Sequence, residues 1–228
     1  MILSLTHNFI FVHVPKAAGS ALTLALRPYS CTPQRTLWAS AKRRLPIVEP
    51  PGVAHFRIHE TAARIRRKLS PEVYAGFHSF AAVRDPFDHA VSHYEYMKQY
   101  RSSRIAARFA EMSFEAYLAH RLETRGPLDR LFVRLPDQCH FLVDDDRRLA
   151  VDRLLRFERL AEDFRALVED LGLGEAQLRS VNKTKSRSDG RSYRDYYDAT
   201  TEDMVRVLYA RDFDMLGYPD RLAGAQVS

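Results

Sequence analysis

Short apolar runs alternate with amphipathic stretches along this chain of 228 residues. Residues 9–14 (FIFVHV) and 77–83 (FHSFAAV) are apolar runs rich in β-forming residues, and they predict two buried strands. Each run leads through a short turn into helix-forming sequence, at residues 20–26 and from residue 86 to about residue 100. The pattern therefore predicts two strand-turn-helix units.

The rest of the chain continues this alternation. Residues 59–69 (HETAARIRRKL) place their apolar side chains on one face, which predicts an amphipathic helix opened by His59. Helices are also expected at 103–110, 113–122, 158–171 (ended by Gly172), 194–198 and 201–216, and strands at 141–143 and 154–157 around a DDDRR turn. This alternation predicts an α/β fold with a central, mainly parallel sheet flanked by helices. The length predicts a single domain over residues 1–228.

Composition and charge limit the partners and the compartment. Apolar residues make up 46% of the chain and charged residues 28%, as in ordinary globular proteins, and the net charge of +6 favours an anionic partner. The first residues lack a basic region and a cleavage site, and no apolar stretch approaches the roughly 20 residues of a membrane helix. Cys31 and Cys139 match no metal spacing. We therefore expect a cytoplasmic protein with no membrane span and no metal site.

The loop VPKAAGSA joins the first predicted strand to its helix. It places Lys16 and the small residues Ala17, Ala18 and Gly19 where backbone N–H groups can converge on a phosphate or sulfate, with Ser20 at the helix start. The alternative is a plain turn whose lysine is solvated. In a Walker A loop a hydroxyl that holds Mg²⁺ follows the lysine, whereas here Lys16 precedes Gly19 and no such hydroxyl follows it. With the sheet pattern, the loop predicts a P-loop-like three-layer fold without metal-dependent nucleotide hydrolysis.

A second candidate anion site lies in AAVRDPFDHAVSHYEY. Arg84 stands at the carboxyl end of the second predicted strand, and Ser92 lies two turns into the helix that follows. The planar guanidinium suits a phosphate because it can donate two parallel hydrogen bonds. The alternative is a structural arginine, paired with a neighbour such as Asp85.

The two segments, FVHVPKAAGSA and AVRDPFDHAVSHY, together resemble the paired signatures for 3′-phosphoadenosine 5′-phosphosulfate (PAPS) of the sulfotransferase family that includes carbohydrate sulfotransferases and many bacterial relatives. The resemblance continues through LLRFERL, NKTKSRS, YRDYYD and YARDFDMLGYP, and so spans residues 9 to 219. Two positions depart from the family pattern. Ala21 stands where a second hydroxyl is common, and His89 stands where arginine is common.

The resemblance implies a PAPS-dependent sulfotransferase and a role for each matching residue. PAPS would be the co-substrate, 3′-phosphoadenosine 5′-phosphate (PAP) the product, and no metal would be required. The loop would hold the 5′-phosphosulfate, through Lys16, Ala17, Ala18, Gly19, Ser20 and Ala21. The 3′-phosphate would be held by Arg84 and Ser92, and a flexible basic segment would close over the nucleotide with Lys183, Lys185, Arg187 and Arg191. For that segment a solvated basic loop is the alternative.

Sulfuryl transfer to a hydroxyl also needs a group that accepts the hydroxyl proton. Lys16 is placed to neutralise the leaving oxygen, and a histidine with a pKa near ~6.5 suits the proton. We favour His59, where bacterial relatives often show histidine, and consider His78 second; a packed or capping histidine is the alternative for either. Residues 28–57, rich in proline, predict an irregular segment near the acceptor entrance. By family analogy, the acceptor is expected to be a carbohydrate or carbohydrate-containing molecule, with an anionic saccharide one candidate.

Two other function classes are compatible with a basic α/β chain. A nucleotide or small-molecule kinase with an atypical phosphate loop would bind ATP and need Mg²⁺. A nucleic-acid-binding module would show a helix-turn-helix, zinc-finger or aromatic RNA-binding signature, and none is visible in the sequence. We therefore expect no nucleic-acid partner.

Overall fold

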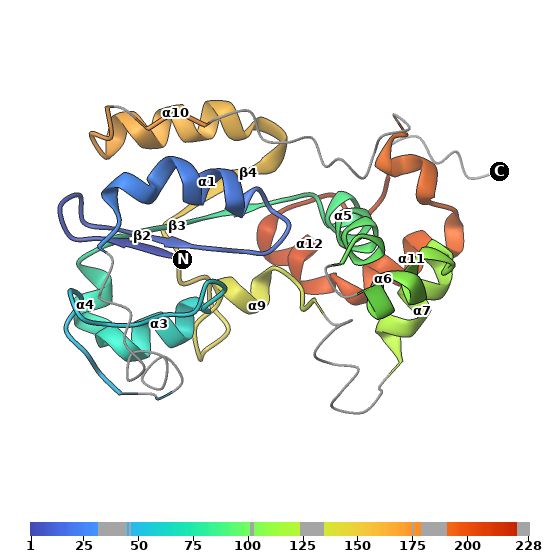
Figure 1. Cartoon of the computed structure of the whole chain (residues 1–228), viewed down its shortest axis with the longest axis horizontal. Helices are drawn as coiled ribbons and strands as arrows, with labels where there is room; N and C mark the ends of the chain where they lie inside the picture. The colour runs from blue at the N-terminus through green and yellow to red at the C-terminus, as the bar shows by residue number, and fades with distance from the viewer. Residues whose placement is uncertain are drawn as a thin grey trace. The chain divides into compact units, whose positions relative to one another are not determined.

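The computed structural model describes residues 1–31, 45, 47–100, 103–123, 135–174, 176–178 and 191–222 (Figure 1). The chain forms two compact units that interleave along the sequence. Unit 1 comprises Met1–Val83 and Gln138–Val181, and unit 2 comprises Arg84–Asp137 and Asn182–Ser228. The chain thus first enters unit 2 at Arg84. The single domain expected from the length stays a prediction.

Unit 1 contains a four-stranded sheet in the order β1-β2-β3-β4. The strands are β1 (Ile2–Ser4), β2 (Phe9–Val12), β3 (His78–Val83) and β4 (Arg153–Arg156). β1 runs antiparallel to β2, whereas β2, β3 and β4 run parallel. The mainly parallel sheet predicted from the sequence is therefore confirmed. The short strand β1 was not predicted as a separate element.

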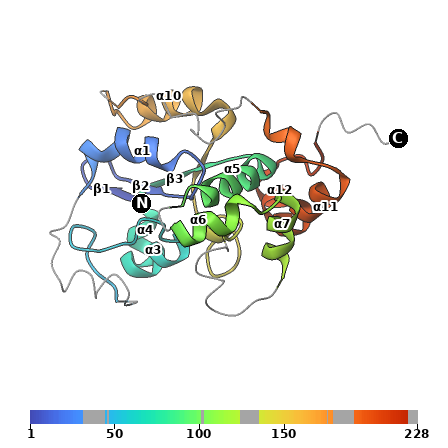
Figure 2. The same cartoon turned by 45° about the vertical axis from the view of Figure 1, so that its right-hand side comes forward.

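Helices cover both faces of this sheet. On one face lie α1 (Gly19–Leu26) and α10 (Leu160–Asp170), and on the other lie α3 (Ala62–Leu69), α4 (Pro71–Ala75) and α9 (Cys139–Leu142) (Figures 1 and 2). Two 3-10 turns, η1 (Arg27–Tyr29) and η2 (Phe157–Arg159), follow α1 and precede α10. Unit 1 thus has the three-layer α/β arrangement that the sequence predicts.

The burial of the sheet on both faces explains its continuous apolar sequence. Every residue of β2 is buried, and Phe80 of β3 contacts Phe9 and Phe11 of β2 with ring centroids 5.6 Å apart in each pair. Parallel strands covered by helices lack the apolar–polar alternation of half-exposed strands. Because burying one such side chain contributes about 1.5–3 kcal/mol, these rings hold β2 beside β3.

Two predicted elements of unit 1 differ from the structure. The helix expected over residues 59–69 begins at Ala62, because the Thr61 hydroxyl caps it by accepting the Arg64 amide at 3.3 Å. His59 therefore lies in a turn before the helix. The strand expected at 141–143 is helix α9, and only its last residue pairs, as part of an isolated bridge across the DDDRR turn. A short apolar run does not distinguish a strand from a buried helical turn.

The described part of unit 2 is helical. Its elements are α5 (Pro86–Lys98), α6 (Ser103–Ala110), α7 (Phe114–Leu122), η4 (Tyr193–Tyr196), α11 (Ala199–Leu208) and α12 (Ala210–Leu216). The start of α5 confirms the sequence prediction, since the Asp85 side chain accepts the Phe87 amide at 2.9 Å and a proline occupies the first turn. The helix expected at 201–216 is divided at Tyr209. An aromatic core joins α5, α7, α11 and α12.

A buried polar cluster lies within this aromatic core. Arg121 of α7 is 4% exposed and donates to the Tyr209 hydroxyl at 2.8 Å and to the Leu135 carbonyl at 2.7 Å. Nδ1 of His89 lies 3.1 Å from the same hydroxyl. Burial raises the pKa of Tyr209, so the phenol stays protonated. Because a buried charge is costly without partners, these bonds restrict how α5 and α7 can pack around Tyr209.

Candidate functional site

The turn between β2 and α1 has the backbone of an anion-binding loop. Lys16 and Ala18 adopt left-handed φ angles of 64° and 60°, whereas Ala17 between them does not. Such alternation turns successive N–H groups toward a common point, where they can bind an anion. A left-handed residue other than glycine costs about 1–2 kcal/mol, so two of them in one turn indicate a conformation imposed by the surrounding fold.

The first turn of α1 adds to this loop. Its N-cap residue is Ala18, and no described side chain makes a capping hydrogen bond there. The first amides of a helix have no acceptor within the helix, and the helix dipole favours an anion at this end. The arrangement fits the phosphate or sulfate group expected from VPKAAGSA.

The His13 ring packs closely against Gly19, the first residue of α1. A Cβ built on Gly19 would lie 1.8 Å from Nε2 of His13, so only glycine leaves room for the ring. His13 is 7% exposed and stacks on Phe11 with ring centroids 5.8 Å apart. Burial, with smaller contributions from His59 and the Met1 amino group, lowers the pKa of His13 to about 3. The imidazole is therefore neutral near physiological pH.

Gly19→Ala is expected to lower the free energy of unfolding by about 1–3 kcal/mol, because the added methyl must displace the His13 ring. We also expect PAP to bind about tenfold more weakly, since the loop backbone shifts with the ring. Chemical unfolding and calorimetric titration measure the two effects. The matched control is Gly174→Ala, whose Cβ would meet no atom within 4 Å and which should leave both unchanged. A Gly19→Ala protein with normal stability would contradict the close contact.

His59 lies beside this loop. Its Nδ1 is 3.2 Å from the His13 carbonyl oxygen, and the two rings meet edge to face with centroids 4.4 Å apart. A carbonyl only accepts hydrogen bonds, so Nδ1 carries the proton and Nε2 the lone pair of the neutral ring. The residue is exposed, and partial burial of the ring lowers the pKa of His59 from its usual 6.5. A neutral, accessible imidazole of this kind can accept a proton near neutral pH.

His78, the second candidate from the sequence, lies at the amino-terminal end of the parallel strands, opposite the end that carries the loop. It begins β3 and pairs in register with Phe9, the first residue of β2. The anion loop follows the last residue of β2, so roughly 10 Å of strand separates the two edges. The structure therefore brings His59 to the loop and does not bring His78 there.

Arg84 opens unit 2 directly after β3, and a carboxylate holds it. The side chain is 5% exposed, and its Nε and Nη2 donate to Oδ2 of Asp88 at 2.6 and 2.5 Å. Asp85, the partner considered from the sequence, instead caps α5 and accepts from the Tyr193 hydroxyl at 3.0 Å. Ser92 is buried one turn beyond Asp88 on the same helix. The pair expected to hold a 3′-phosphate thus lies at the start of α5.

Asp88 is a residue of this site that the sequence analysis did not single out. Two of the five N–H donors of the Arg84 guanidinium go to its carboxylate, which sets the orientation of the fork. The signal was present in the sequence, because residues four apart near a helix start are placed to form an ion pair. The pattern also offered Asp85 beside it, and only the structure separates the two.

The other residues expected to bind the nucleotide are described in part. Ser20 and Arg191 are exposed, and Ala21 is half-buried. The rest of the predicted basic segment lies outside the described residues: Lys183, Lys185 and Arg187. Within the described ranges, no helix is long and apolar enough to cross a membrane, and no group of three or more His, Cys, Asp or Glu side chains is placed to hold a metal ion.

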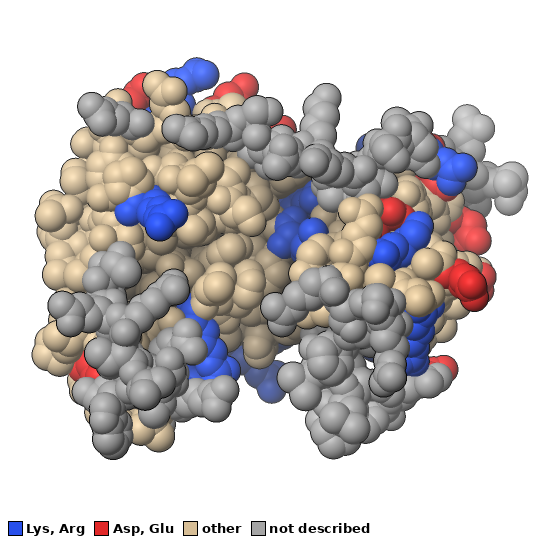
Figure 3. Space-filling view, in the orientation of Figure 1, with Lys and Arg blue, Asp and Glu red and all other residues tan. Residues whose placement is uncertain are grey.

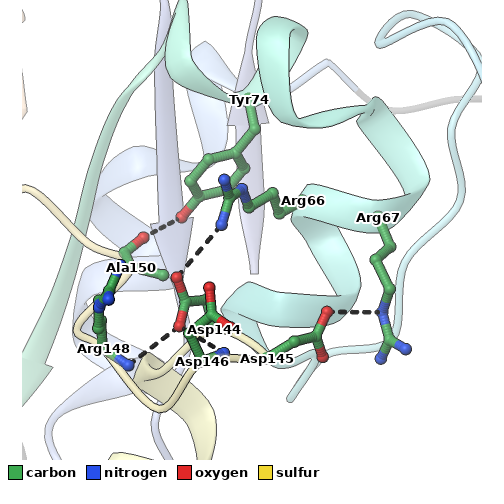
Figure 4. A network of polar contacts seen from close by, with 8 residues as sticks. All are labelled: Arg66, Arg67, Tyr74, Asp144, Asp145, Asp146, Arg148 and Ala150. Atoms are coloured by element: carbon green, nitrogen blue, oxygen red, sulfur yellow. Dashed lines mark hydrogen bonds and ion pairs between the residues drawn. The ribbon is translucent and has the colours of Figure 1, made fainter.

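The arginines near the end of α3 form ion pairs with acidic residues (Figure 4). Nη1 of Arg66 lies 3.2 Å from Oδ2 of Asp144, and Nε of Arg67 lies 3.8 Å from Oδ2 of Asp145. The other oxygen of Asp144 accepts the Arg148 amide at 3.0 Å, which fixes the carboxylate within its turn. Surface ion pairs of this kind contribute only about 0–1 kcal/mol each to stability, but they reduce the local positive charge.

Lys68, in the same basic stretch, is buried. Its side chain is 0% exposed and donates to the His55 carbonyl, with Glu49 at 3.8 Å. Burial lowers the pKa of Lys68. On the face drawn in Figure 3, the described lysine and arginine side chains form separate groups, with uncharged residues and, on the right of the view, acidic residues between them. The basic stretch of α3 is therefore largely neutralised or buried.

Among the comparisons with known proteins, the family model gives a match. A family model described as the sulfotransferase family matches residues 1–219 of the 228. The match includes the Lys16 loop, His59 and Arg84. No curated protein and no solved structure gives a significant match. The chain therefore belongs to the sulfotransferase family, as its motifs predicted, and is an enzyme that transfers a sulfuryl group.

Proposed function

We propose that this enzyme transfers the sulfuryl group of PAPS to a hydroxyl of a carbohydrate or carbohydrate-containing acceptor, without a metal ion. The observation that carries the proposal is the hydrogen bond of 3.2 Å between His59 and the His13 carbonyl, which anchors a histidine beside the Lys16 loop. Transfer to a hydroxyl needs a positioned proton acceptor and a site for the anionic donor. His59 and the loop proposed for the 5′-phosphosulfate both belong to unit 1 and follow the carboxyl end of β2 in the chain.

The residues of the loop fit a phosphosulfate group. The alternating backbone at Lys16 and Ala18 and the first turn of α1 suit an anion. When bound, PAPS supplies an electrophilic sulfur and a phosphate oxygen that gains negative charge as it leaves. The Lys16 ammonium stabilises that charge, and this stabilisation is greatest in the transition state. Arg84 and Ser92 bind the 3′-phosphate, for which a guanidinium is well suited.

His59 acts as the general base toward the acceptor. Its Nε2 takes the hydroxyl proton while the acceptor oxygen bonds to sulfur and the bond from sulfur to the phosphate oxygen breaks. The proton ends on His59, and the negative charge ends on the 5′-phosphate of PAP beside Lys16. The His13 carbonyl, which accepts from Nδ1, stabilises the imidazolium that forms.

The acceptor class rests on the family resemblance and on the charge of α3. The sequence offered an anionic saccharide as one candidate because the chain is basic. Arg66 and Arg67 have acidic partners and Lys68 is buried, so this stretch offers little net charge to a polyanion. We therefore place a neutral sugar hydroxyl first among the acceptors.

The test of this function is an assay with radiolabelled PAPS in the presence of a metal chelator. A panel of neutral sugars, uronic-acid oligosaccharides and glycolipids serves as acceptors. The expected result is a labelled acceptor with stoichiometric PAP, and neutral sugars should be sulfated best. ATP with Mg²⁺ should yield no phosphorylated product, which separates this proposal from the small-molecule kinase considered from the sequence. Phosphorylation with ATP and no transfer from PAPS would overturn it.

Arg84→Ala is expected to weaken PAP binding about 10–100-fold, because the variant removes a charged donor of the 3′-phosphate. Adenosine 5′-phosphosulfate, which lacks that phosphate, should bind with nearly unchanged affinity. Calorimetric titration with both nucleotides measures the difference.

The control for this prediction addresses the buried partner of the arginine. Arg84→Ala leaves the Asp88 carboxylate without its ion pair, which lowers stability. The double variant Arg84→Ala/Asp88→Ala removes both charges, so it should recover part of the stability but not the preference for PAP. An equal loss of affinity for both nucleotides would contradict the assignment of Arg84 to the 3′-phosphate.

A further inference from the structure

The contact between His13 and His59 joins two segments far apart in the sequence. His13 follows β2 and His59 precedes α3, yet their ring centroids are 4.4 Å apart with an angle of 66° between the ring planes. The His13 ring also fills the space that a side chain at position 19 would occupy. One imidazole thus contacts both the start of α1 and the histidine that we propose as base.

The hydrogen bond at this contact selects one tautomer of His59. Nδ1 of His59 is the atom that lies 3.2 Å from the His13 carbonyl. With its proton on Nδ1, the neutral ring presents the lone pair of Nε2, the atom farther from the backbone. A residue outside a helix or strand keeps such an orientation only if its neighbours restrict the ring.

We infer that His13 is a positioning residue: its ring packs against the His59 ring and keeps Nδ1 of His59 at the His13 backbone carbonyl, which selects the Nδ1–H tautomer. This inference deepens the proposed function and rests on it, because the tautomer of His59 matters for catalysis only if His59 is the general base. Because it is only 7% exposed, His13 is not assigned a contact with the acceptor. It acts through His59, by keeping its own carbonyl and ring against that side chain.

The charge state of His13 supports this role. Burial is the largest cause of its low pKa of about 3, so the ring remains uncharged where a second imidazolium would repel a protonated His59. Among the described residues, the Met1 amino group acts on both rings. Burial lowers the pKa of that amino group to about 5, although the Glu60 carboxylate raises it, so the group is mostly uncharged near neutral pH. With a neutral His13 ring beside it, His59 keeps the lone pair of its Nε2 available over a wider range of pH than it would beside an imidazolium.

The first test reads the tautomer directly and needs no turnover. Long-range ¹H–¹⁵N spectra of the free protein, with the His59 signals assigned from His59→Asn, distinguish a protonated from an unprotonated ring nitrogen. Above its titration, His59 should show only the Nδ1–H form, and His13→Ala should show a mixture of both forms. A single Nδ1–H form in His13→Ala would overturn the inference, as would an Nε2–H form in the unmodified protein. His13→Gln, closer in volume, takes the place of His13→Ala if that variant does not fold.

The second test uses turnover in a double-mutant cycle. His13→Ala should lower kcat about 10²-fold through misplacement of the base. The rates are measured at saturating PAPS, so that a change in donor affinity through the loop does not enter kcat. If His13 acts through His59, His13→Ala/His59→Ala should be no slower than His59→Ala alone. Losses that multiply would show an independent structural effect and overturn the inference. Full turnover of His59→Ala would overturn the proposed base, whereas the spectra would still report whether His13 sets the tautomer.

Discussion

Lys16→Met is expected to lower kcat/KM for sulfuryl transfer about 10²–10³-fold, the usual effect of removing one group that stabilises developing charge. Methionine matches the length of lysine without the charge, and it adopts the left-handed φ of 64° at this position about as readily. The loop backbone should therefore persist, and the loss should report the ammonium alone. Single-turnover measurements with saturating PAPS would show the loss in the chemical step.

The matched control for this prediction is Lys98→Met. Lys98 lies at the end of α5, where its ammonium is 3.1 Å from Glu95, and the position has no role in the proposed chemistry. Its loss should leave kcat/KM unchanged. Normal turnover in Lys16→Met would contradict the proposed role of the Lys16 ammonium, because the variant removes that charge and keeps the loop backbone.

His59→Asn is expected to reduce kcat about 10²–10⁴-fold while PAP binds normally, because the variant lacks the proton acceptor but keeps the donor site. The pH profile of the unmodified enzyme gives a second readout. The pKa of His59 is lowered from 6.5, and the base works only when neutral, so turnover should stay high as the pH falls to 6.5 and decline only below it. Stopped-flow or steady-state rates across this range measure the acid limb.

The histidine at the opposite edge of the sheet provides the control for His59. His78→Asn should keep kcat, because His78 begins β3 in register with the first residue of β2 and lies away from the loop. If His78→Asn lost activity and His59→Asn kept it, the assignment of the base would be reversed. An acid limb well above pH 6.5 would also contradict His59 as the titrating group.

Much of the fold could be predicted because the signals were local. Apolar runs predicted β2 and β3, and an aspartate followed by proline predicted the start of α5. The strand predicted at residues 141–143 was wrong because the apolar run there is too short to show a period. Three apolar residues before the DDDRR turn have no period of their own, and packing against the sheet made them helix α9.

The candidate site was less predictable from the sequence than the fold, because its geometry depends on contacts between distant segments. The motifs identified Lys16 and Arg84 one residue at a time, without the bonds that orient them. The contact of His59 with His13 spans 46 positions, and its geometry depends on how the chain returns to β2 before α3. The position of His78, by contrast, could have been predicted, because the first residue of a parallel strand lies at the edge away from the loops that follow the strands.

The histidine at position 89, where arginine is common in the family pattern, has a consequence for redesign. His89 shares the Tyr209 hydroxyl with the Arg121 guanidinium, and all three side chains are buried. An arginine at position 89 would bury a second cation beside the Arg121 guanidinium, and two like charges in a buried site repel each other. A consensus-based redesign that introduces arginine at position 89 should therefore lower the free energy of unfolding, unless position 121 is changed with it.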